Sequence, residues 1–466
     1  MNKDIFLELL KNKEFKAVKS ILDIMNAVDI AELLSDLDDK ELIQAFRLIQ
    51  KSKAAEVFTE MSNSMQAYLV EKFSEKELMD ILDDLYMDDT VDLLEELPAN
   101  LVTRILDYGI YFTPITTSSP SNLVTRILDY VDPEKRAQIN TLLNYPEDST
   151  GSIMTTEYVT LKKDTTVAGA LAHIKETGIH KETIYTCYIL ENRKLRGIVT
   201  AKELLTRDDD VTMEELMKTE FIYVTTHTDQ EETAKLFSKY GLLAIPVVDK
   251  QGFMVGIVTV DDAMDVMLDE TTEDMELMSA LSPSETSYFE TSILTHAKNR
   301  IGWLMFLMLS ATITQTIIAK YESAFAALPL LVSFIPMLTD TGGNCGSQSS
   351  TLIIRGLALD EIKFEDLFKV MFKEFRIALI VGFVLSITNG IYIMIRYKNP
   401  TIAFLVGLSL IATILMAKII GSILPLIAKK LHFDPAIMAA PLITTIVDAG
   451  SILVYFSLAT KLLGLA

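Results

Sequence analysis

A single carboxylate lies within the last long apolar stretch of the chain. Asp448 falls in the segment 441–450, and Thr444 and Thr445 stand one helical turn before it. An ionised side chain inside a membrane-spanning helix costs on the order of 2.5–3.5 kcal/mol on insertion, so such residues usually have a function. Carboxylate and hydroxyl oxygens are ligands for hard cations such as Mg2+, and Ca2+ or Mn2+ can use the same groups. Pro441, two turns before Asp448, is expected to remove one helical hydrogen bond and free a carbonyl. The alternative is a structural Asp448 that caps a kink or pairs with Lys418.

A second polar segment precedes it in the sequence. Residues 342–348 contain three glycines, Asn344 and Gln348 within an otherwise apolar stretch. Glycines let two helices approach closely, and backbone and amide oxygens can line a path for ions. The segment therefore predicts either a close helix contact beside a cation path or the packing of small residues alone.

A third group of candidate residues is acidic and lies outside the apolar stretches. Asp262 and Asp265 are one helical turn apart, and Glu270, Glu273 and Asp274 recur at spacings of three and four. Like charges on one helix face repel each other unless a cation binds among them or water surrounds them. We therefore expect a cation-binding face here, with a solvated acidic helix as the alternative.

The charge of the chain is divided between two regions. The 466 residues carry a formal net charge of −22, and 50% of them are hydrophobic. Residues 1–299 contain 55 acidic and 29 basic side chains, whereas residues 300–466 contain 9 and 13. An acidic soluble region argues against nucleic acid as a partner, because phosphates need Lys and Arg. The two cysteines lack metal-ligand spacing, which argues against a zinc site, and the sequence shows no nucleophile, His-centred base or phosphate loop, so we expect no enzyme.

The basic third of the chain predicts five membrane-spanning helices. The apolar stretches are 301–319, a stretch between residues 322 and 355, 377–395, 399–427 and 435–460. Each is long enough to cross about 30 Å of hydrocarbon. Nine Lys and Arg residues flank the ends on the N-terminal side of the membrane, and four flank the opposite ends. Because basic residues favour the cytoplasmic side and no signal peptide is apparent, we expect a cytoplasmic N-terminus and an extracellular C-terminus. Glu374, at the cytosolic edge of the third stretch, is either a pore-entrance group or an interfacial charge, and we favour the interfacial charge.

The acidic two-thirds begins with helices and continues with alternating strands and helices. Apolar residues recur at helical spacing over residues 1–140, which is typical of a stacked helical domain. Residues 100–108 recur letter for letter at 122–130, which indicates a local duplication or insertion. From about residue 149 two α/β units follow, each with a Met-containing lead-in (151–155 and 216–219), an apolar strand (185–190 and 244–248) and a Gly-Ile-Val-Thr step (197–200 and 256–259).

These two units resemble a tandem pair of CBS domains, a regulatory α/β module. In CBS domains that hold nucleotides, a Thr-x-x-Asp step contacts phosphate and ribose. Thr259 and Asp262 match that step in the second unit, whereas the first unit has Thr200 and Glu203 at the same places. The resemblance therefore implies that ATP or another adenine nucleotide is a candidate ligand of the second unit.

The order of these parts is similar to that of the MgtE magnesium channel family. The similarity covers essentially the whole chain and includes residues 341–348, the run that ends at Arg355, the 434–436 triplet and residues 441–448. It implies a multi-domain fold. The expected parts are an all-α helical superhelix (1–147, with the insertion near 107–130), two α/β CBS domains (148–207 and 208–268), a connecting plug helix and linker (269–299), and an all-α pore domain of five transmembrane helices (300–466).

The resemblance also implies roles for the polar residues. Asp448 would hold hydrated Mg2+ in the pore of a homodimer in the cell membrane, with Asn344, Thr444 and Thr445 beside it. Regulatory Mg2+ would bind acidic residues of the N-terminal domain, the CBS pair and the plug helix. These are Asp88, Asp89 or Asp92; Asp229, Glu231, Asp262 and Asp265; and Glu270, Glu273 and Asp274. We expect negative feedback, in which bound ions draw the plug helix against the pore at high cytosolic Mg2+.

Two other functions stay open from the residues alone. One is a nucleotide-sensing exporter or transporter of another divalent metal, such as Mn2+ or Co2+, with Thr259 and Asp262 as the sensor. The other is a membrane anchor for a cation-binding scaffold that transports nothing. Loss of Asp448 would not affect such a scaffold.

Overall fold

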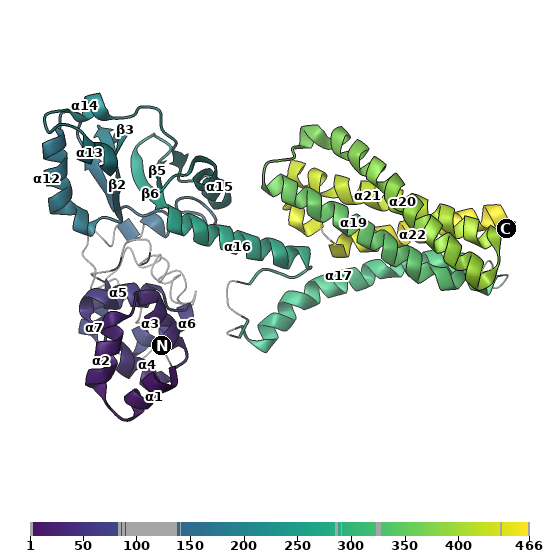
Figure 1. Ribbon diagram of the computed structural model, residues 1–466, viewed down its shortest axis with the longest axis horizontal. Helices are drawn as coiled ribbons and strands as arrows, with labels where there is room; N and C mark the ends of the chain where they lie inside the picture. Colours follow the sequence, from purple (N-terminus) through teal and green to yellow (C-terminus); the bar gives the residue numbers. More distant parts are fainter. Residues whose placement is uncertain are drawn as a thin grey trace, which may run out of the picture. The chain divides into compact units, whose positions relative to one another are not determined.

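The computed structural model divides the chain into two compact units (Figure 1). Unit 1 spans Met1–Leu268, and unit 2 spans Asp269–Ala466. The structure describes residues 3–82, 85, 89, 138–139, 141–284, 288–289, 291–322, 328–438 and 440–464. The predicted duplication at 100–108 and 122–130 therefore lies outside the described residues, as do Asp88 and Asp92.

Unit 1 begins with short helices, which are purple and blue in Figure 1. They are α1 (Lys3–Lys11), α2 (Phe15–Ile24), α3 (Ala27–Ser35), α4 (Asp39–Phe46), α5 (Lys51–Thr59), α6 (Asn63–Lys72) and α7 (Glu75–Leu82). Their apolar residues recur at helical spacing, and Phe6, Leu22, Ile30, Leu34 and Phe58 are almost fully buried. The predicted helical N-terminal region is thus confirmed for the described residues, while a superhelical path for it stays a prediction.

Side-chain caps fix where these helices begin. The Asn26 side chain accepts a hydrogen bond from the Asp29 N–H before α3, and Asp38 accepts from the N–H groups of Lys40 and Glu41 before α4. Such caps satisfy backbone donors that a helix leaves without partners at its N-terminus. Part of the acidic charge of this region therefore serves helix capping.

Two three-stranded sheets follow, each with one parallel and one antiparallel strand pair. The first has the order β1 (Tyr158–Leu161), β2 (Thr183–Glu191) and β3 (Lys194–Thr200), and the second has β4 (Val224–Thr225), β5 (Ala244–Val248) and β6 (Met254–Thr259). The accompanying helices are α12 (Val167–Thr177), α13 (Ala201–Thr206), α14 (Met213–Leu216) and α15 (Gln230–Tyr240). The prediction of two α/β units is confirmed.

The segment that precedes each sheet pairs with a strand of the other α/β half. Thr155, before the first sheet, bridges to Ile257 of β6, and Lys218, before the second sheet, bridges to Ile198 of β3. A Cβ on Gly256 would lie 2.8 Å from the Met154 sulfur, and one on Gly197 would lie 2.8 Å from the Met217 sulfur. The glycine of each Gly-Ile-Val-Thr step is therefore the place where the methionine of the other half packs.

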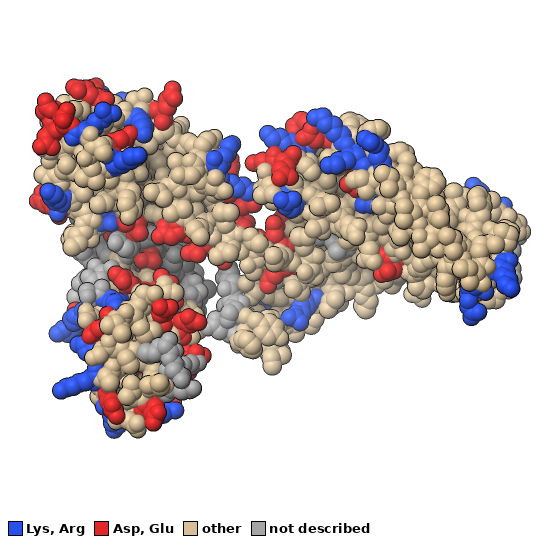
Figure 2. Space-filling model, in the orientation of Figure 1, with Lys and Arg blue, Asp and Glu red and all other residues tan. Residues whose placement is uncertain are grey.

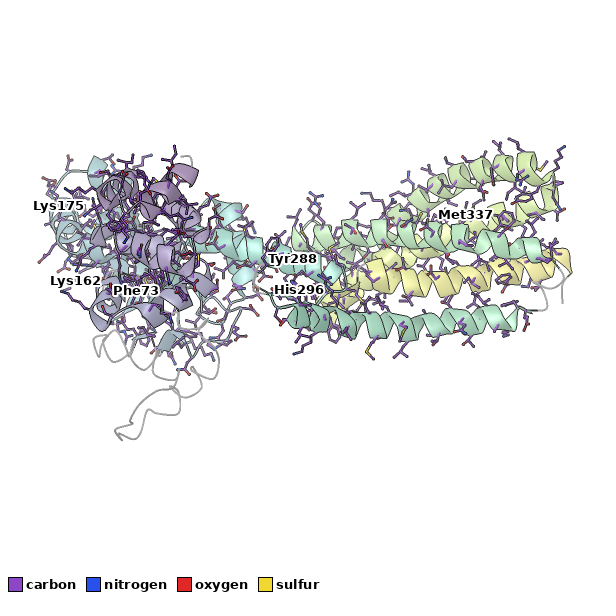
Figure 3. The ribbon with its side chains drawn as sticks, turned by 90° about the horizontal axis from the view of Figure 1, so that it is seen from below. Phe73, Lys162, Lys175, Tyr288, His296 and Met337 are labelled. Atoms are coloured by element: carbon purple, nitrogen blue, oxygen red, sulfur yellow. The ribbon has the colours of Figure 1, made fainter. Side chains whose placement is uncertain are left out.

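Helix α16 (Val260–Met278) continues the second half, and a linker connects it to the first membrane helix, α17 (Ile293–Lys320). At the start of α17, a ring nitrogen of His296 lies 3.0 Å from the Tyr288 carbonyl oxygen, and the two rings are 5.0 Å apart (Figure 3). The Ser282 N–H donates to the Asn299 carbonyl. These contacts fold the linker back against the first turns of α17.

The remaining elements of unit 2 are long helices joined by short turns. They are a 3-10 turn (Pro329–Phe334), α19 (Ile335–Ala358), a second 3-10 turn (Phe364–Asp366), α20 (Leu367–Tyr397), α21 (Pro400–Lys430), a third 3-10 turn (Pro435–Met438) and α22 (Ala440–Leu463). Helix α21 is central, because 56% of its most apolar 18-residue segment is buried inside the chain, whereas 0% of the corresponding segment of α17 is buried. Large apolar side chains on α17 and α20 are thus left for lipid or for another subunit.

Four helical segments among the described residues are long and apolar enough to cross a membrane. They are Ile293–Lys320, Phe364–Tyr397, Pro400–Lys430 and Pro435–Leu463. Helix α19 has 24 residues, but its polar glycine segment makes it less apolar than these four. The visible face of unit 2 is largely free of charge between basic groups near its two ends (Figure 2). The chain is therefore a multi-pass membrane protein, and α19 accounts for the fifth predicted segment only in part.

Candidate functional site

Helices α19 and α22 approach closely at the predicted glycine segment. A Cβ on Gly343 would lie 2.5 Å from Thr444 Cγ2, and one on Gly346 would lie 2.7 Å from Ile443 Cγ2. Gly342 meets Val447 in the same way, at 2.9 Å. Any larger residue at these three positions would push the helices apart. The glycines therefore bring the Asn344 region of α19 beside the Asp448 region of α22.

A polar stripe runs along the exposed face of α19. Asp340, Asn344 and Gln348 are each exposed, whereas Gly343 and Cys345 between them are buried. Residues four apart share one helix face, so these three side chains form a line. Asp340 was not among the predicted site residues, although its spacing from Asn344 was a usable signal.

Asp448 is half-buried on α22, and its strongest charged neighbour is Asp340. Among the described residues no ion pair to Asp448 is formed; Lys418 instead lies 3.4 Å from the Glu374 carboxylate. The alternative of a structural Asp448–Lys418 pair is therefore wrong. The prediction that Glu374 is an interfacial charge is also wrong, because Glu374 is only 6% exposed.

The two threonines before Asp448 hold the first turns of α22. The hydroxyls of Thr444 and Thr445 each donate to the Pro441 carbonyl oxygen over 3.0 Å. Pro441 is the second residue of α22, where a proline removes no helical hydrogen bond. The prediction that Pro441 removes a helical hydrogen bond two turns before Asp448 is therefore wrong, and α22 is continuous through the Asp448 region.

A cluster of carboxylates in unit 1 involves Asp89 and the start of α16. Burial, together with the charges of Asp262, Glu157 and Asp261, raises the pKa of Asp89 to about 6. Burial and the same group of neighbours raise the pKa of Glu182 to about 8. Burial also raises the pKa of Asp262 and of Asp265. These carboxylates therefore repel one another when ionised.

The sequence predicted part of this cluster. Asp89, Asp262 and Asp265 were expected. Glu157, directly before β1, and Glu182, directly before β2, were missed. The Glu182 N–H donates to the Glu157 carbonyl, which ties the two segments together. No sequence spacing could have paired them, because β1 and α12 intervene.

Asp262 also has a local structural role. Its carboxylate accepts hydrogen bonds from the Thr259 hydroxyl over 2.5 Å and from the Thr259 N–H over 3.2 Å. In the first half, Glu203 accepts from Thr200 in the same way, over 2.8 Å from both the hydroxyl and the N–H. Both Thr-x-x-acid steps therefore stabilise the start of a helix.

The other predicted regulatory residues lie apart from this cluster or continue along α16. Asp229 caps α15 and accepts from the Glu231 and Glu232 N–H groups, and Glu231 pairs with Lys235 over 2.6 Å. Glu270, Glu273 and Asp274 lie on α16 beyond the boundary between the units. Among the described residues no group of three or more His, Cys, Asp or Glu side chains is arranged closely enough to hold a metal ion.

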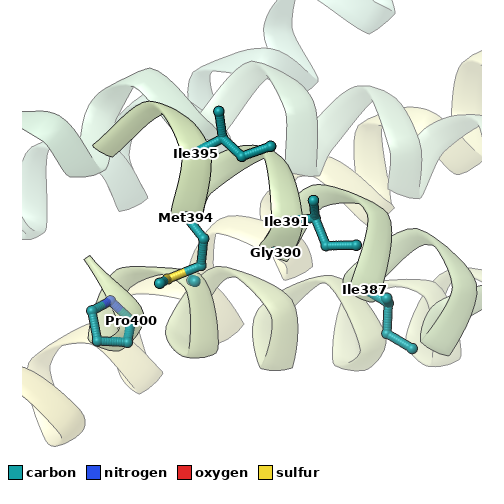
Figure 4. Close-up of a pocket in the computed structure, with 7 residues that line it drawn as sticks. Ile387, Gly390, Ile391, Met394, Ile395 and Pro400 are labelled. Carbon is teal, nitrogen blue, oxygen red and sulfur yellow. The ribbon is translucent and has the colours of Figure 1, made fainter. Parts of the chain in front are cut away.

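An apolar groove in unit 2 lies elsewhere and is not an ion site. It has a volume of about 570 Å³ and is lined by apolar residues of α20 and α21, among them Ile387, Met394 and Ala403 (Figure 4). Its lining includes no titratable side chain. Its apolar lining is suited to contact with the hydrocarbon chains of lipids.

Comparison with known proteins agrees with this arrangement. Residues 335–458 match the MgtE family, described as a divalent cation transporter; residues 25–108 match the MgtE intracellular N domain; and residues 151–210 and 213–269 match CBS domains. A solved cytosolic domain of the Mg2+ channel MgtE in complex with ATP is 31% identical, with a TM-score of 0.49, over 56% of this chain and 98% of that one.

Two curated relatives match nearly the whole chain. The magnesium transporter MgtE of Thermus thermophilus is 33% identical over 98% of this chain and 97% of its own length. The magnesium transporter MgtE of Bacillus subtilis is 30% identical over 97% of this chain and 95% of its own length. The chain therefore belongs to the MgtE family of divalent cation transporters.

Proposed function

We propose that this protein carries Mg2+ across the cell membrane along a path lined by α19 and α22. The observation that carries the proposal is the stripe of Asp340, Asn344 and Gln348, exposed on a helix of an apolar bundle and adjoining Asp448. Polar side chains at membrane depth are tolerated where they meet protein or a water-filled path. A line of oxygen-bearing side chains suits a cation that keeps part of its water shell, as Mg2+ does.

The same stripe supports a homodimer with five spanning helices per subunit. Within one chain nothing described covers the stripe, since all three of its residues are exposed. A second subunit related by a two-fold axis would place two stripes and two Asp448 carboxylates around one path. In that arrangement α19 is the fifth spanning helix, and its polar face lines water instead of lipid. The distribution of Lys and Arg supports a cytoplasmic N-terminus and an extracellular C-terminus.

Regulation by cytosolic Mg2+ is proposed at the carboxylate cluster of unit 1. Burial and mutual repulsion raise the pKa of Asp89 and Asp262, and a divalent cation would relieve that repulsion. The Glu182 Oε2 atom is buried with no hydrogen-bond partner among the described residues, so the cluster has an unused ligand atom. In the described arrangement these carboxylates are not close enough to share one ion, so binding would draw Asp89, Asp262 and Asp265 together. Glu270, Glu273 and Asp274 are the predicted ligands on the continuing α16. Binding would favour the closed state, because ions join segments that otherwise repel.

Adenine nucleotide binding at the second CBS half stays a prediction. Its residues, Thr259 and Asp262, are hydrogen-bonded to each other at the start of α16. Calorimetry with ATP in the absence of Mg2+ tests the prediction, and the Thr259→Ala variant is the control that should weaken binding.

Uptake in Mg2+-starved cells tests the transport proposal against a non-transporting scaffold. Cells that depend on this protein should grow at low external Mg2+ with the wild type and fail with Asp448→Ala at equal protein levels in the membrane. Equal growth with both forms would support the scaffold and contradict transport.

A further inference from the structure

A buried polar triad joins three helices of unit 2. The Lys418 ammonium on α21 donates to Ser349 Oγ on α19 over 3.0 Å and to Glu374 Oε2 on α20 over 3.4 Å. Ser349 Oγ in turn donates to Glu374 Oε2 over 2.7 Å. Ser349 is fully buried, and Lys418 and Glu374 are 5% and 6% exposed. The three groups therefore satisfy one another away from solvent.

The triad is tied to the glycine segment beside the proposed path. Lys418 directly follows Ala417, whose carbonyl oxygen would lie 3.2 Å from a Cβ on Gly346. Ser349 lies one turn beyond Gly346, on the buried side of α19, whereas Asn344 and Gln348 lie on its exposed side. The hydrogen bond from Lys418 to Ser349 therefore joins α21 to the helix that carries the polar stripe.

The charges of the triad also matter to a cation nearby. In a region of low dielectric an uncompensated ammonium repels a divalent ion strongly, and over longer distances than in water. Glu374 is the only carboxylate within ion-pair distance of Lys418 in the described part of the chain. Without Glu374, Lys418 would place a positive charge directly behind the helix that lines the path.

We propose that Glu374 is a positioning residue for cation conduction. It neutralises Lys418 within the bundle, which keeps the ammonium charge from opposing Mg2+ on the path. This inference rests on the proposed function, because it assumes that α19 lines the conducting path.

The test is a comparison of charge-matched variants in proteoliposomes. Wild type, Glu374→Gln, the neutral pair Glu374→Gln/Lys418→Met, and the control Glu365→Gln are reconstituted at equal density. Glu365 is an exposed carboxylate before α20 and undergoes the same chemical change. The measured quantities are the maximal Mg2+ flux and the Mg2+ concentration that gives half of it.

Glu374→Gln is expected to raise the half-saturating Mg2+ concentration by about ten-fold or more, since the field of an unpaired charge is only weakly screened in the bundle. The neutral pair should return it to within about three-fold of wild type, because an apolar replacement of a buried ion pair is commonly tolerated. Glu365→Gln should match wild type.

Recovery of the half-saturating Mg2+ concentration in the neutral pair separates charge compensation from a packing role. If Glu374 acted only through packing, the double variant would conduct worse than Glu374→Gln. If Glu374→Gln does not fold, wild-type flux in a folded neutral pair still supports the proposal. A neutral pair that fails to fold, or that folds and conducts no better than Glu374→Gln, overturns it. A half-saturating Mg2+ concentration in Glu374→Gln equal to that of the wild type overturns the proposal as well. Absence of flux in the wild type would instead contradict the proposed function.

Discussion

Gly421 of α21 lies directly against Gly346 of α19. A Cβ on Gly421 would collide with the Gly346 carbonyl oxygen, and Gly346 itself contacts Ile443 of α22. The backbones of α19 and α21 therefore touch beside the segment that carries Asn344, and a side chain of α22 packs on the same glycine. Small residues allow such contacts in membranes, where packing replaces the hydrophobic effect as the force between helices.

Gly421→Ala should lower both Mg2+ flux and the thermal stability of the purified protein. The added methyl group cannot avoid the Gly346 backbone, so α19 and α21 must separate, and overpacking of this kind commonly costs about 1–3 kcal/mol. Gly390→Ala is the matched control, since a Cβ there meets nothing within 4 Å. Equal melting temperatures and fluxes for the two variants would contradict the close contact.

Asp262→Asn/Asp265→Asn should leave the protein conducting at internal Mg2+ concentrations that inhibit the wild type. The substitutions remove two of the carboxylates whose repulsion a bound cation would relieve. Flux is measured in proteoliposomes while Mg2+ is varied on the side of the cytosolic domains. Asp208→Asn/Asp210→Asn, which changes two exposed carboxylates in the first CBS half, is the control. Unchanged inhibition in the Asp262/Asp265 variant would remove these residues from the mechanism.

Asp229→Ala should destabilise the second CBS half without changing the response to Mg2+. Asp229 accepts hydrogen bonds from the N–H groups of Glu231 and Glu232 at the start of α15, and loss of such a cap costs about 1 kcal/mol. Asp229→Ser keeps a capping oxygen but removes the carboxylate, so it should restore stability. If Asp229→Ser instead shifts the Mg2+ dependence of flux, Asp229 acts as a cation ligand.

The stability of the N-terminal helices should depend on pH through Glu77. Burial by itself would raise the pKa of Glu77. Hydrogen bonds from Arg47 and Ser74 outweigh burial and lower this pKa from 4.5 to about 2. A depressed carboxyl pKa stabilises the folded state above pH 4.5, and this contribution is lost as the pH falls towards 2. Glu77→Gln should therefore speed hydrogen exchange in α4 and α7 at pH 7, by a modest factor because solvent screens the pair. The difference between variant and wild type should shrink below pH 4.5; a difference that is constant with pH would contradict this account.

Much of unit 1 could be predicted because its signals are local. The predicted strand at 244–248 coincides with β5 (Ala244–Val248), and the predicted strand at 185–190 lies within β2 (Thr183–Glu191). Continuous apolar runs bounded by glycine and polar residues are typical of buried strands. The roles of Gly197 and Gly256 were not predictable, because the methionines that pack on them belong to the other half.

The pore region shows the limits of such reasoning. The stretch between residues 322 and 355 was predicted as one spanning segment, but a 3-10 turn precedes α19 within it, and hydropathy does not distinguish the two. Lys418 was paired with the wrong carboxylate, because its partners Glu374 and Ser349 lie 44 and 69 residues away in the sequence. Only helix packing decides which of the two carboxylates, Glu374 or Asp448, it reaches.

The most direct test of the account is Mg2+ flux into proteoliposomes containing wild type, Asp448→Asn or the control Asp360→Asn. Asp360 lies in the exposed loop after α19, so its substitution makes the same chemical change outside the path. The account predicts Mg2+ entry with wild type and Asp360→Asn, and a loss of about ten-fold or more with Asp448→Asn, because a neutral amide binds a hydrated divalent ion far less well than a carboxylate. Equal Mg2+ entry through all three proteins would contradict it.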